Sequence, residues 1–282
     1  MLTIGTADSG GTMYPVGTAI AELLSGDTMK VNVGSSTGSP MNIQSLANGD
    51  VDLALVSGDA ADEAYRAGKE GAGLRAVAAV FTSLSNWLAP EDQGIAYVHE
   101  LKGLRVGVGP ENSRTELAAR IVIETLGLDQ SDTVLVNCAL SAGTELLPSE
   151  KIDAMHGFAG IPIGGFSTLT EKIPCRVLRY TRGELDAILA SNSIYTPAII
   201  PAHTYEGQEE DIETFGAKCL LCVDASMDEE LVYSITKTIW ENRETISQAH
   251  PSMSVMEDAS YLFDDLPIPL HSGAERLYEE IS

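Results

Sequence analysis

Three short loops rich in glycine and hydroxyl side chains carry the residues best suited to bind a ligand. They span residues 10–12, 34–39 and 112–115, and each precedes a segment in which apolar residues recur at helical spacing. The first turn of a helix leaves backbone N–H groups without intrahelical acceptors, and the helix dipole adds partial positive charge there. Because such a loop binds an anion without a buried lysine, the sequence predicts a site for a small carboxylate or phosphate.

Particular side chains in and near these loops are predicted ligand contacts. The ring of Tyr14 could cover a ligand beside the first loop, and Asp59 could recognise an amino group or form an ordinary Asx turn. Trp87 could line a cleft or pack in a core. Ser39 is also expected to cap the helix that follows it, a role that any helix requires. The predicted ligand-binding residues are Gly11, Thr12, Tyr14, Thr37, Gly38, Ser39, Asn42, Asp59, Trp87, Ser113, Arg114, Thr115, Phe158 and Gly160.

Signals for catalysis, metal binding or redox chemistry are weak in this sequence. It contains no G-x-S-x-G elbow and no GxxxxGK[ST] phosphate loop, and GVGPEN matches only part of a dinucleotide fingerprint. Cys219 and Cys222 form a C-x-x-C motif, but residues three apart in the predicted strand point to opposite faces. No second cysteine or histidine pair completes a zinc site, and the five histidines lack ligand spacing. We therefore predict buried thiols, no catalytic residue, no metal and no cofactor.

The length and charge of the 282-residue chain limit its partners. A formal net charge of −24 argues against nucleic acid, whose phosphates are bound by clustered Lys and Arg, and disfavours an anionic membrane surface. A local pocket can still attract an anion, because the Debye length is about 8 Å at physiological salt. No run approaches the roughly 20 apolar residues of a transmembrane helix. Residues 2–4 already read as a strand, so the protein is either cytoplasmic or an exported protein whose signal peptide has been removed.

Strands and helices alternate along the chain with short loops between them, which predicts an α/β fold with parallel sheets. The series restarts near residue 100. We therefore predict two domains joined by extended crossings, with residues 1–88 and 215–282 in domain I, residues 89–214 in domain II and the ligand cleft between them. Phe158 and Gly160 follow a predicted strand of domain II, at the end where ligands lie in open α/β sheets.

Local signals set several element boundaries. A short helix is predicted over residues 62–67, and a capping box of Ser226 and Glu229 predicts the start of another helix. The acidic residues 209–213 are expected to form a solvated loop. Arg114 is expected at the start of a helix, where its guanidinium either faces the ligand or points outward, to the other domain or into solvent as a flexible side chain.

Five segments of the sequence together resemble the TAXI family of substrate-binding proteins, the extracytoplasmic receptors of ion-gradient-driven TRAP transporters. They read GTADSGGTMYPVG, STGSPMNIQSLANGDVDLALVSGD, LKGLRVGVGPENSRTE, KIDAMHGFAGIP and PAHTYEGQEEDI, and the resemblance runs from residue 2 to about residue 278. It implies a two-domain periplasmic-binding-protein fold of type II with two crossing hinge strands. It also implies a monomeric receptor, periplasmic or lipid-anchored at the outer cell surface, that passes a small anionic ligand to TRAP membrane subunits without spanning the membrane itself.

The resemblance implies a ligand such as glutamate, glutamine, 2-oxoglutarate or another C4–C5 carboxylate. The chain departs from the family at Met13, where an aromatic residue is usual, and at Arg114, where glycine is usual. An arginine beside the ligand could clamp a carboxylate through two hydrogen bonds. We therefore interpret the chain as a non-enzymatic solute receptor that closes on a small carboxylate by hinge motion. The alternative is a cytoplasmic α/β enzyme, such as a transferase acting on a small phosphorylated or carboxylated metabolite.

Overall fold

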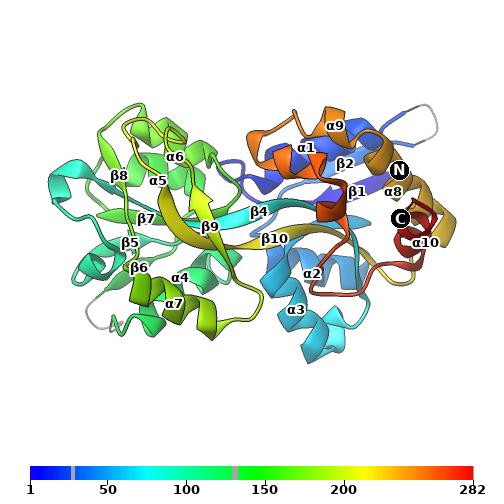
Figure 1. The fold of residues 1–282 in the computed structure, drawn as a ribbon, viewed down its shortest axis with the longest axis horizontal. Helices are drawn as coiled ribbons and strands as arrows, with labels where there is room; N and C mark the ends of the chain where they lie inside the picture. The colour runs from blue at the N-terminus through cyan, green and yellow to red at the C-terminus, as the bar shows by residue number, and fades with distance from the viewer. Residues whose placement is uncertain (27–28, 129–132, 282) are drawn as a thin grey trace. The chain divides into compact units, whose positions relative to one another are not determined.

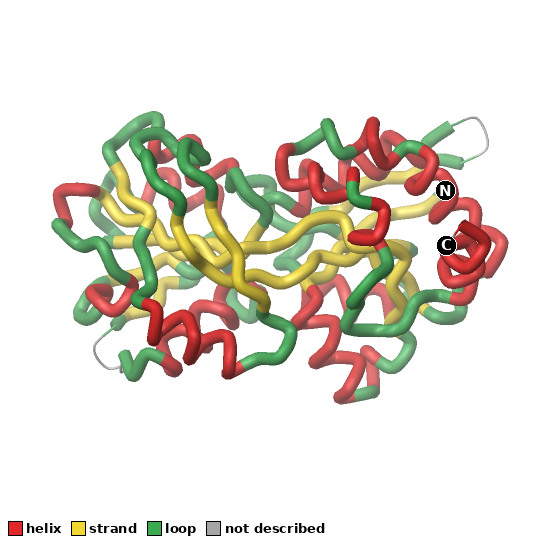
Figure 2. Tube along the Cα trace, in the orientation of Figure 1, coloured by secondary structure: helices red, strands yellow, loops and turns green. Residues whose placement is uncertain are grey.

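The chain forms two compact units in the computed structural model, which describes residues 1–26, 29–128 and 133–281. Unit 1 comprises Met1–Ala7, Met13–Thr82 and Lys218–Ser282, and unit 2 comprises Asp8–Thr12 and Ser83–Ala217. The short segment Asp8–Thr12 thus groups with unit 2, although the chain before and after it lies in unit 1. The path of the chain can be followed by colour in Figure 1 and by type of element in Figure 2.

Unit 1 contains a mixed sheet with the strand order β2-β1-β3-β10. The strands that contribute to it are β1 (Leu2–Gly5), β2 (Val31–Gly34), β3 (Leu53–Ser57), β4 (Leu74–Pro90) and β10 (Ile212–Asp224). β1 pairs in parallel with both β2 and β3, and β10 runs antiparallel to β3. Parallel neighbours end at the same edge of the sheet, so the loops after β1, β2 and β3 lie along one edge.

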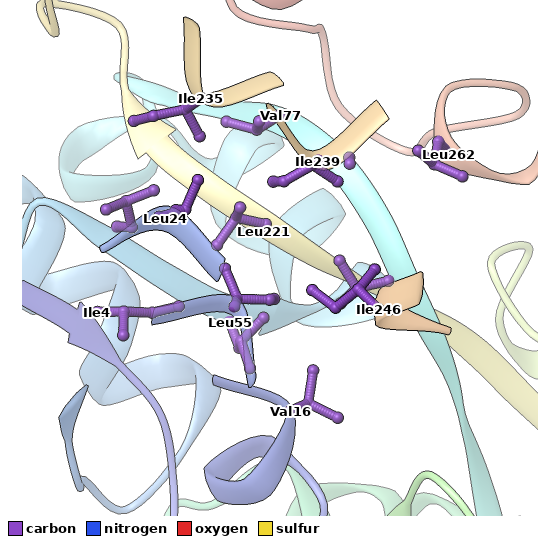
Figure 3. Close-up of a cluster of buried hydrophobic side chains, with 14 of the residues drawn as sticks. Ile4, Val16, Leu24, Leu55, Val77, Leu221, Ile235, Ile239, Ile246 and Leu262 are labelled. Atoms are coloured by element: carbon purple, nitrogen blue, oxygen red, sulfur yellow. The ribbon is translucent and has the colours of Figure 1, made fainter. Parts of the chain in front are cut away.

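Helices cover both faces of the unit 1 sheet. They are α1 (Met13–Leu24), α2 (Ser39–Asn48), α3 (Gly58–Ala67), α8 (Glu229–Glu241), α9 (Arg243–Ile246) and α10 (Ser272–Ile281), with 3₁₀ turns η1 (Lys69–Gly71), η4 (Pro251–Glu257) and η5 (Ala259–Leu262). Figure 1 shows α1 and α9 on one face and α2 and α3 on the other. α1 places Val16, Ile20 and Leu24 at helical spacing in the core of its face, as Figure 3 shows for Val16 and Leu24. Ile43 and Leu46 of α2 pack in the core of the opposite face.

Unit 2 repeats this three-layer arrangement. Its own strands are β5 (Arg105–Gly107), β6 (Val134–Val136), β7 (Ala154–Ala159), β8 (Cys175–Val177) and β9 (Thr196–Ile200). Its helices are α4 (Arg114–Thr125), α5 (Leu140–Leu146), α6 (Gly164–Thr170) and α7 (Arg182–Ser191), with 3₁₀ turns η2 (Glu91–Gln93) and η3 (Val98–Leu101). β5 runs parallel to β6 and β7, while β4 runs antiparallel to β7 and β8. α4 and α7 share one core, and α5 and α6 share another on the opposite face (Figure 1).

The strands β4 and β10 are neighbours in the sheet, and each contributes residues to both units. β4 is continuous over the 17 residues Leu74–Pro90. Cys219 and Cys222 of β10 are buried free thiols that lie in two different cores of unit 1. The predicted strand with thiols on opposite faces is therefore confirmed. No helix of the described residues combines the length and apolar character needed to cross a membrane.

Two predicted helix starts are wrong. Gly38 is the N-cap of α2, and Ser39 is the first helical residue rather than the cap. α3 begins at Gly58 instead of near residue 62, so Asp59 lies in the first turn of a helix and not in an Asx turn before one. Both differences arise because the strand-to-helix loops are shorter than the pattern of polar residues indicates.

The predicted start of α8 is also wrong. Asp228, not Ser226, caps this helix, because the Asp224 carboxylate already accepts hydrogen bonds from both the N–H and the hydroxyl of Ser226. The expected acidic loop is correct for residues 209–211, which are exposed, but residues 212–213 already belong to β10.

Candidate ligand-binding loops

The loop between β2 and α2 is held in place by the side chain of Asn42. Its Nδ2 atom donates to the carbonyls of Thr6 and Leu55 at 2.8 Å each, after β1 and within β3. The Ser36 hydroxyl lies 2.7 Å from Asn42 Oδ1 and accepts from the N–H of Gly38 at 2.9 Å. Asn42 is only 1% exposed. Its amide thus ties the end of β1, the middle of β3 and the loop after β2 together and fixes the course of the loop.

Gly38 leaves the start of α2 open. Its backbone has φ 112° and ψ −157°, a region that essentially only glycine adopts without strain. A Cβ atom at this position would have no other heavy atom within 4 Å. The first-turn N–H groups of a helix have no intrahelical acceptor. Pro40 has no N–H, so this helix start can present the N–H groups of Ser39 and Met41 to an anion.

The Ser39 hydroxyl is engaged by the protein itself. It accepts from the N–H of Ser57 at 2.9 Å, and Ser57 donates through its own hydroxyl to Asp59 Oδ1 at 2.5 Å. Asp59 also accepts from the N–H of Ala60 and is 2% exposed. These bonds join the start of α2 to the start of α3. Ser39 and Asp59 thus have structural partners, and their contact with a ligand stays a prediction.

Tyr14 and Thr37 are the exposed members of the predicted set in unit 1. Tyr14 lies in the first turn of α1 and is 37% exposed. Met41, which was not predicted, lies in the first turn of α2 and is 43% exposed. Because β1 and β2 are parallel neighbours, α1 and α2 begin at the same edge of the sheet. These side chains are available to cover the apolar part of a ligand.

The segment Asp8–Thr12 packs against the start of α5. The Asp8 carboxylate accepts from the N–H and the hydroxyl of Ser141, at 3.1 and 2.8 Å. Gly10 allows this approach, because a Cβ atom there would lie 2.5 Å from the Ser141 nitrogen. Asp8 therefore acts on α5 as an N-capping side chain supplied from a distant part of the sequence.

The same segment reaches two further parts of unit 2. The Gly10 carbonyl accepts from the N–H of Gly165 in the first turn of α6 at 3.1 Å. The Thr12 hydroxyl donates to the carbonyl of Gly160 at 2.5 Å. The structure thus brings Thr12 beside Gly160, and it uses polar groups of this first glycine loop for packing.

The start of α4 carries an anion of its own. Ser113 caps this helix by accepting from the N–H of Glu116 at 3.2 Å. The Glu116 carboxylate accepts from the N–H of Asn112 at 2.5 Å and from Arg120 at 2.6 Å, and it is 3% exposed. Burial raises the pKa of Glu116, but the bonds from Arg120 and Asn112 more than offset this, so its pKa lies below the ordinary value. An anion bound at the start of α4 would be repelled by the Glu116 carboxylate. This internal anion distinguishes the start of α4 from the start of α2.

Arg114 is a buried residue. Its exposed fraction is 6%, and its Nη2 atom donates to the Tyr195 hydroxyl at 3.3 Å. Tyr195 packs against Phe158 with ring centroids 6.0 Å apart, and both lie in the core under α4 and α7. A flexible side chain extending into solvent is therefore excluded for Arg114. Its contact with a ligand carboxylate stays a prediction.

Trp87 lies in the core of unit 2, the second of its two predicted alternatives. It is 1% exposed and donates from Nε1 to the Tyr180 hydroxyl at 2.6 Å. His156 stands opposite Trp87 in the β4–β7 pair, with ring centroids 4.2 Å apart, and its Nδ1 atom lies 3.0 Å from the carbonyl of Thr115. Burial lowers the pKa of His156 to about 3, so the ring is neutral at physiological pH.

Two surface cavities of unit 2 lie away from the predicted contacts. One of about 380 Å³ is bordered by Tyr97, Arg176 and Arg179, and another of about 600 Å³ by Leu147 and Ile152. Neither is lined by a predicted ligand-binding residue. Among the residues that the structure describes, no group of three or more His, Cys, Asp or Glu side chains is arranged to hold a metal ion.

Comparison with protein families places the chain in one of them. The NMT1-like family matches residues 4–281, nearly the whole sequence. The chain belongs to the NMT1-like family. The match covers almost the same span as the TAXI resemblance, but it does not show a TAXI receptor in particular, so that assignment stays a prediction.

Solved structures of solute-binding proteins share the fold of this NMT1-like chain. The substrate-binding protein of an amino acid ABC transporter is 13% identical with a TM-score of 0.56, over 92% of this chain and 97% of its own. The ligand-binding component of an ABC-type import system from Staphylococcus aureus is 13% identical with a TM-score of 0.54, over 97% and 83%. The periplasmic aliphatic sulphonate binding protein of Escherichia coli is 15% identical with a TM-score of 0.51, over 99% and 82%. These similarities confirm the predicted α/β periplasmic-binding-protein fold and agree with its two-domain, type II form.

Several residues that shape the loops of this NMT1-like chain were missed from sequence. Asp8 and His156 bond partners 133 and 41 residues away, and neither gives a local signal. Glu116 does give one, because Ser113 and Glu116 have the spacing of a capping box. Met41 was missed because an apolar residue in the first turn of a helix reads as ordinary core.

Proposed function

We propose that this protein is an extracytoplasmic solute receptor that binds a small carboxylate and serves a TRAP transporter, as TAXI receptors do. Membership of the NMT1-like family and the fold shared with solute-binding proteins support a receptor. The TAXI-like segments of the sequence support the TRAP system. The receptor is monomeric and passes its ligand unchanged to the membrane subunits.

The observation that carries this proposal is the open start of α2. Asn42 fixes the preceding loop, and Gly38 adds no side chain to the space in front of the helix. Backbone N–H groups and the exposed Thr37 hydroxyl can then bind carboxylate oxygens through neutral donors. Affinity from fixed donors needs no nucleophile and no general base, which suits a receptor.

Each of the two predicted domains contributes contacts to the ligand in this proposal. Residues 1–88 with 215–282 supply the α2 start, and residues 89–214 supply contacts from Ser113, Arg114 and Thr115. The strands β4 and β10, which contribute to both units, serve as the hinge through which the receptor responds to its ligand. Arg114, held at its fixed place by Tyr195, provides the cationic contact.

A carboxylate with a short apolar spacer fits the groups available. The donors at α2 suit the acid group, and the exposed side chains of Tyr14 and Met41 suit the carbon chain. Relatives by fold include a protein of an amino acid transporter and one that binds aliphatic sulphonates, and both kinds of compound carry an acid group. Glutamate, glutamine and 2-oxoglutarate are accordingly the first compounds to test.

A thermal-shift screen tests the proposal, with L-glutamate, L-glutamine, 2-oxoglutarate and succinate set against D-glucose. A ligand at 100 times its dissociation constant adds about 2.7 kcal/mol to the free energy of unfolding. This raises the melting temperature by roughly 5 °C for a chain of this length. We expect at least one acid to raise the melting temperature of the protein. The ¹H NMR spectrum of that acid should be unchanged after incubation with the protein. Conversion to a product would favour the transferase alternative, and a shift with glucose alone would contradict the proposal.

A further inference from the structure

Four buried side chains and one backbone carbonyl of unit 2 form one continuous chain of hydrogen bonds. Trp87 Nε1 lies 2.6 Å from the Tyr180 hydroxyl, which lies 2.9 Å from the Ser85 hydroxyl. Ser85 lies 3.1 Å from His156 Nε2, and His156 Nδ1 lies 3.0 Å from the Thr115 carbonyl. The four side chains are at most 8% exposed. The chain links the strands β4 and β7 to the first turn of α4.

Because the His156 ring is neutral, the two ends of this chain fix the direction of every bond in it. An indole N–H can only donate, and a carbonyl can only accept. All four contacts are satisfied when Tyr180 accepts from Trp87 and donates to Ser85, and Ser85 donates to His156 Nε2. His156 then donates from Nδ1 to Thr115. The neutral ring is thereby held as the tautomer with its proton on Nδ1.

Packing and neighbouring bonds restrict the His156 ring further. The ring lies against Trp87, directly across the β4–β7 pair, with centroids 4.2 Å apart. The carbonyl of Ser85 is itself held by the Thr214 hydroxyl of β10 at 2.7 Å. Because both ring nitrogens are bonded and one face is covered, the Nδ1–H points in one fixed direction.

We propose that His156 is a positioning residue for the loop of residues 112–115. Its Nδ1–H holds the Thr115 carbonyl, and through the backbone it sets the place of the Ser113 cap and of Arg114. The effect on affinity rests on the proposed function, because it requires this loop to contact the ligand. The effect on the loop itself does not.

Two substitutions of similar size separate the bond from the bulk of the side chain. In His156→Asn the side-chain amide can still donate to Thr115, whereas His156→Leu removes this donor and leaves the carbonyl with its intrahelical partner alone. Hydrogen–deuterium exchange reports on the loop through the amides of Glu116 and Leu117, which bond Ser113 in the native loop. We expect these amides to exchange at least tenfold faster in His156→Leu than in His156→Asn.

Tyr180→Phe tests the chain at a distance, because it removes the hydroxyl between Trp87 and Ser85 and leaves His156 in place. Tyr278→Phe is the matched control, since its buried hydroxyl donates to the Val77 carbonyl in unit 1. We expect faster exchange at Glu116 and Leu117 in Tyr180→Phe only. Equal exchange in the two tyrosine variants, or in the two His156 variants, would overturn the proposal.

Two more measurements complete the test. ¹⁵N NMR of the wild-type His156 ring at pH 7.5 should show the proton on Nδ1, and a proton on Nε2 would contradict the bond chain. L-Glutamate serves as the probe ligand, with at least tenfold weaker binding expected in His156→Leu than in His156→Asn. If the wild type does not bind L-glutamate or its C4–C5 relatives, the proposed function fails, while exchange and NMR still decide the positioning role.

Discussion

Lowering the pH from 7.5 to 5.0 is expected to destabilise the protein through His156. Burial lowers the pKa of this histidine to about 3 in the folded chain, while histidine in an unfolded chain has a pKa of about 6.5. Between these values the unfolded chain binds one more proton at this position than the folded chain does. The free energy of unfolding therefore falls as the pH falls below about 6.5.

The size of this effect at pH 5.0 follows from the unfolded pKa, because the folded ring is still neutral at that pH. A gap of about 1.5 pH units, at about 1.36 kcal/mol per unit, gives roughly 2 kcal/mol. This is a large share of a stability that is typically about 5–15 kcal/mol. The loss grows as the pH falls further towards the folded pKa.

Urea unfolding followed by circular dichroism at pH 7.5 and pH 5.0 measures this loss. His156→Asn is the comparison, because asparagine does not titrate while the carboxylates of the chain titrate alike in both proteins. We expect the wild type to lose roughly 2 kcal/mol more than the variant between the two pH values. Equal losses, or a folded-state ring that titrates near pH 6.5 by NMR, would refute the reasoning.

Three other substitutions test the candidate loops. Asn42→Asp turns the donor facing the Thr6 and Leu55 carbonyls into an acceptor. Its free energy of unfolding in urea should be about 1–3 kcal/mol lower than that of Asn42→Ala. Equal free energies in the two variants would contradict the role of the amide. Gly38→Ala forces a Cβ onto a backbone with φ 112° and should cost about 1–3 kcal/mol; a neutral effect in the same assay argues against the strain. Arg114→Gly should weaken dicarboxylate binding at least tenfold, about 1.4 kcal/mol, and reduce the preference for the diacid over its amide in calorimetry. Unchanged affinity and selectivity would place Arg114 outside the site.

The fold could be predicted largely from periodicity. The runs VDLALV and LRAVAAVF are continuous and apolar, which is typical of strands buried on both faces, and they form β3 and the first part of β4. α5 and α6 were not predicted. Each has seven residues and contains glycine, so neither is long enough to display a helical period.

The places of the candidate loops could also be predicted, but the direction of their side chains could not. A serine before a helix reads as a cap, yet Ser39 instead accepts from Ser57, 18 residues further along the chain. Burial of Arg114 beside Tyr195 depends on a partner 81 residues away. Such contacts are decided by tertiary packing, which a local pattern does not contain.

Calorimetric titration with a panel of C3 to C6 carboxylates tests the central claim most directly. The panel pairs L-glutamate, 2-oxoglutarate and succinate with counterparts in which uncharged amides replace the acid groups. We predict one ligand bound per chain, at least one acid that binds more tightly than its amide counterpart, and weaker binding of that acid to Gly38→Ala than to the wild type. Tight binding of a neutral sugar or a cation, with no binding of any carboxylate in the panel, would contradict the account.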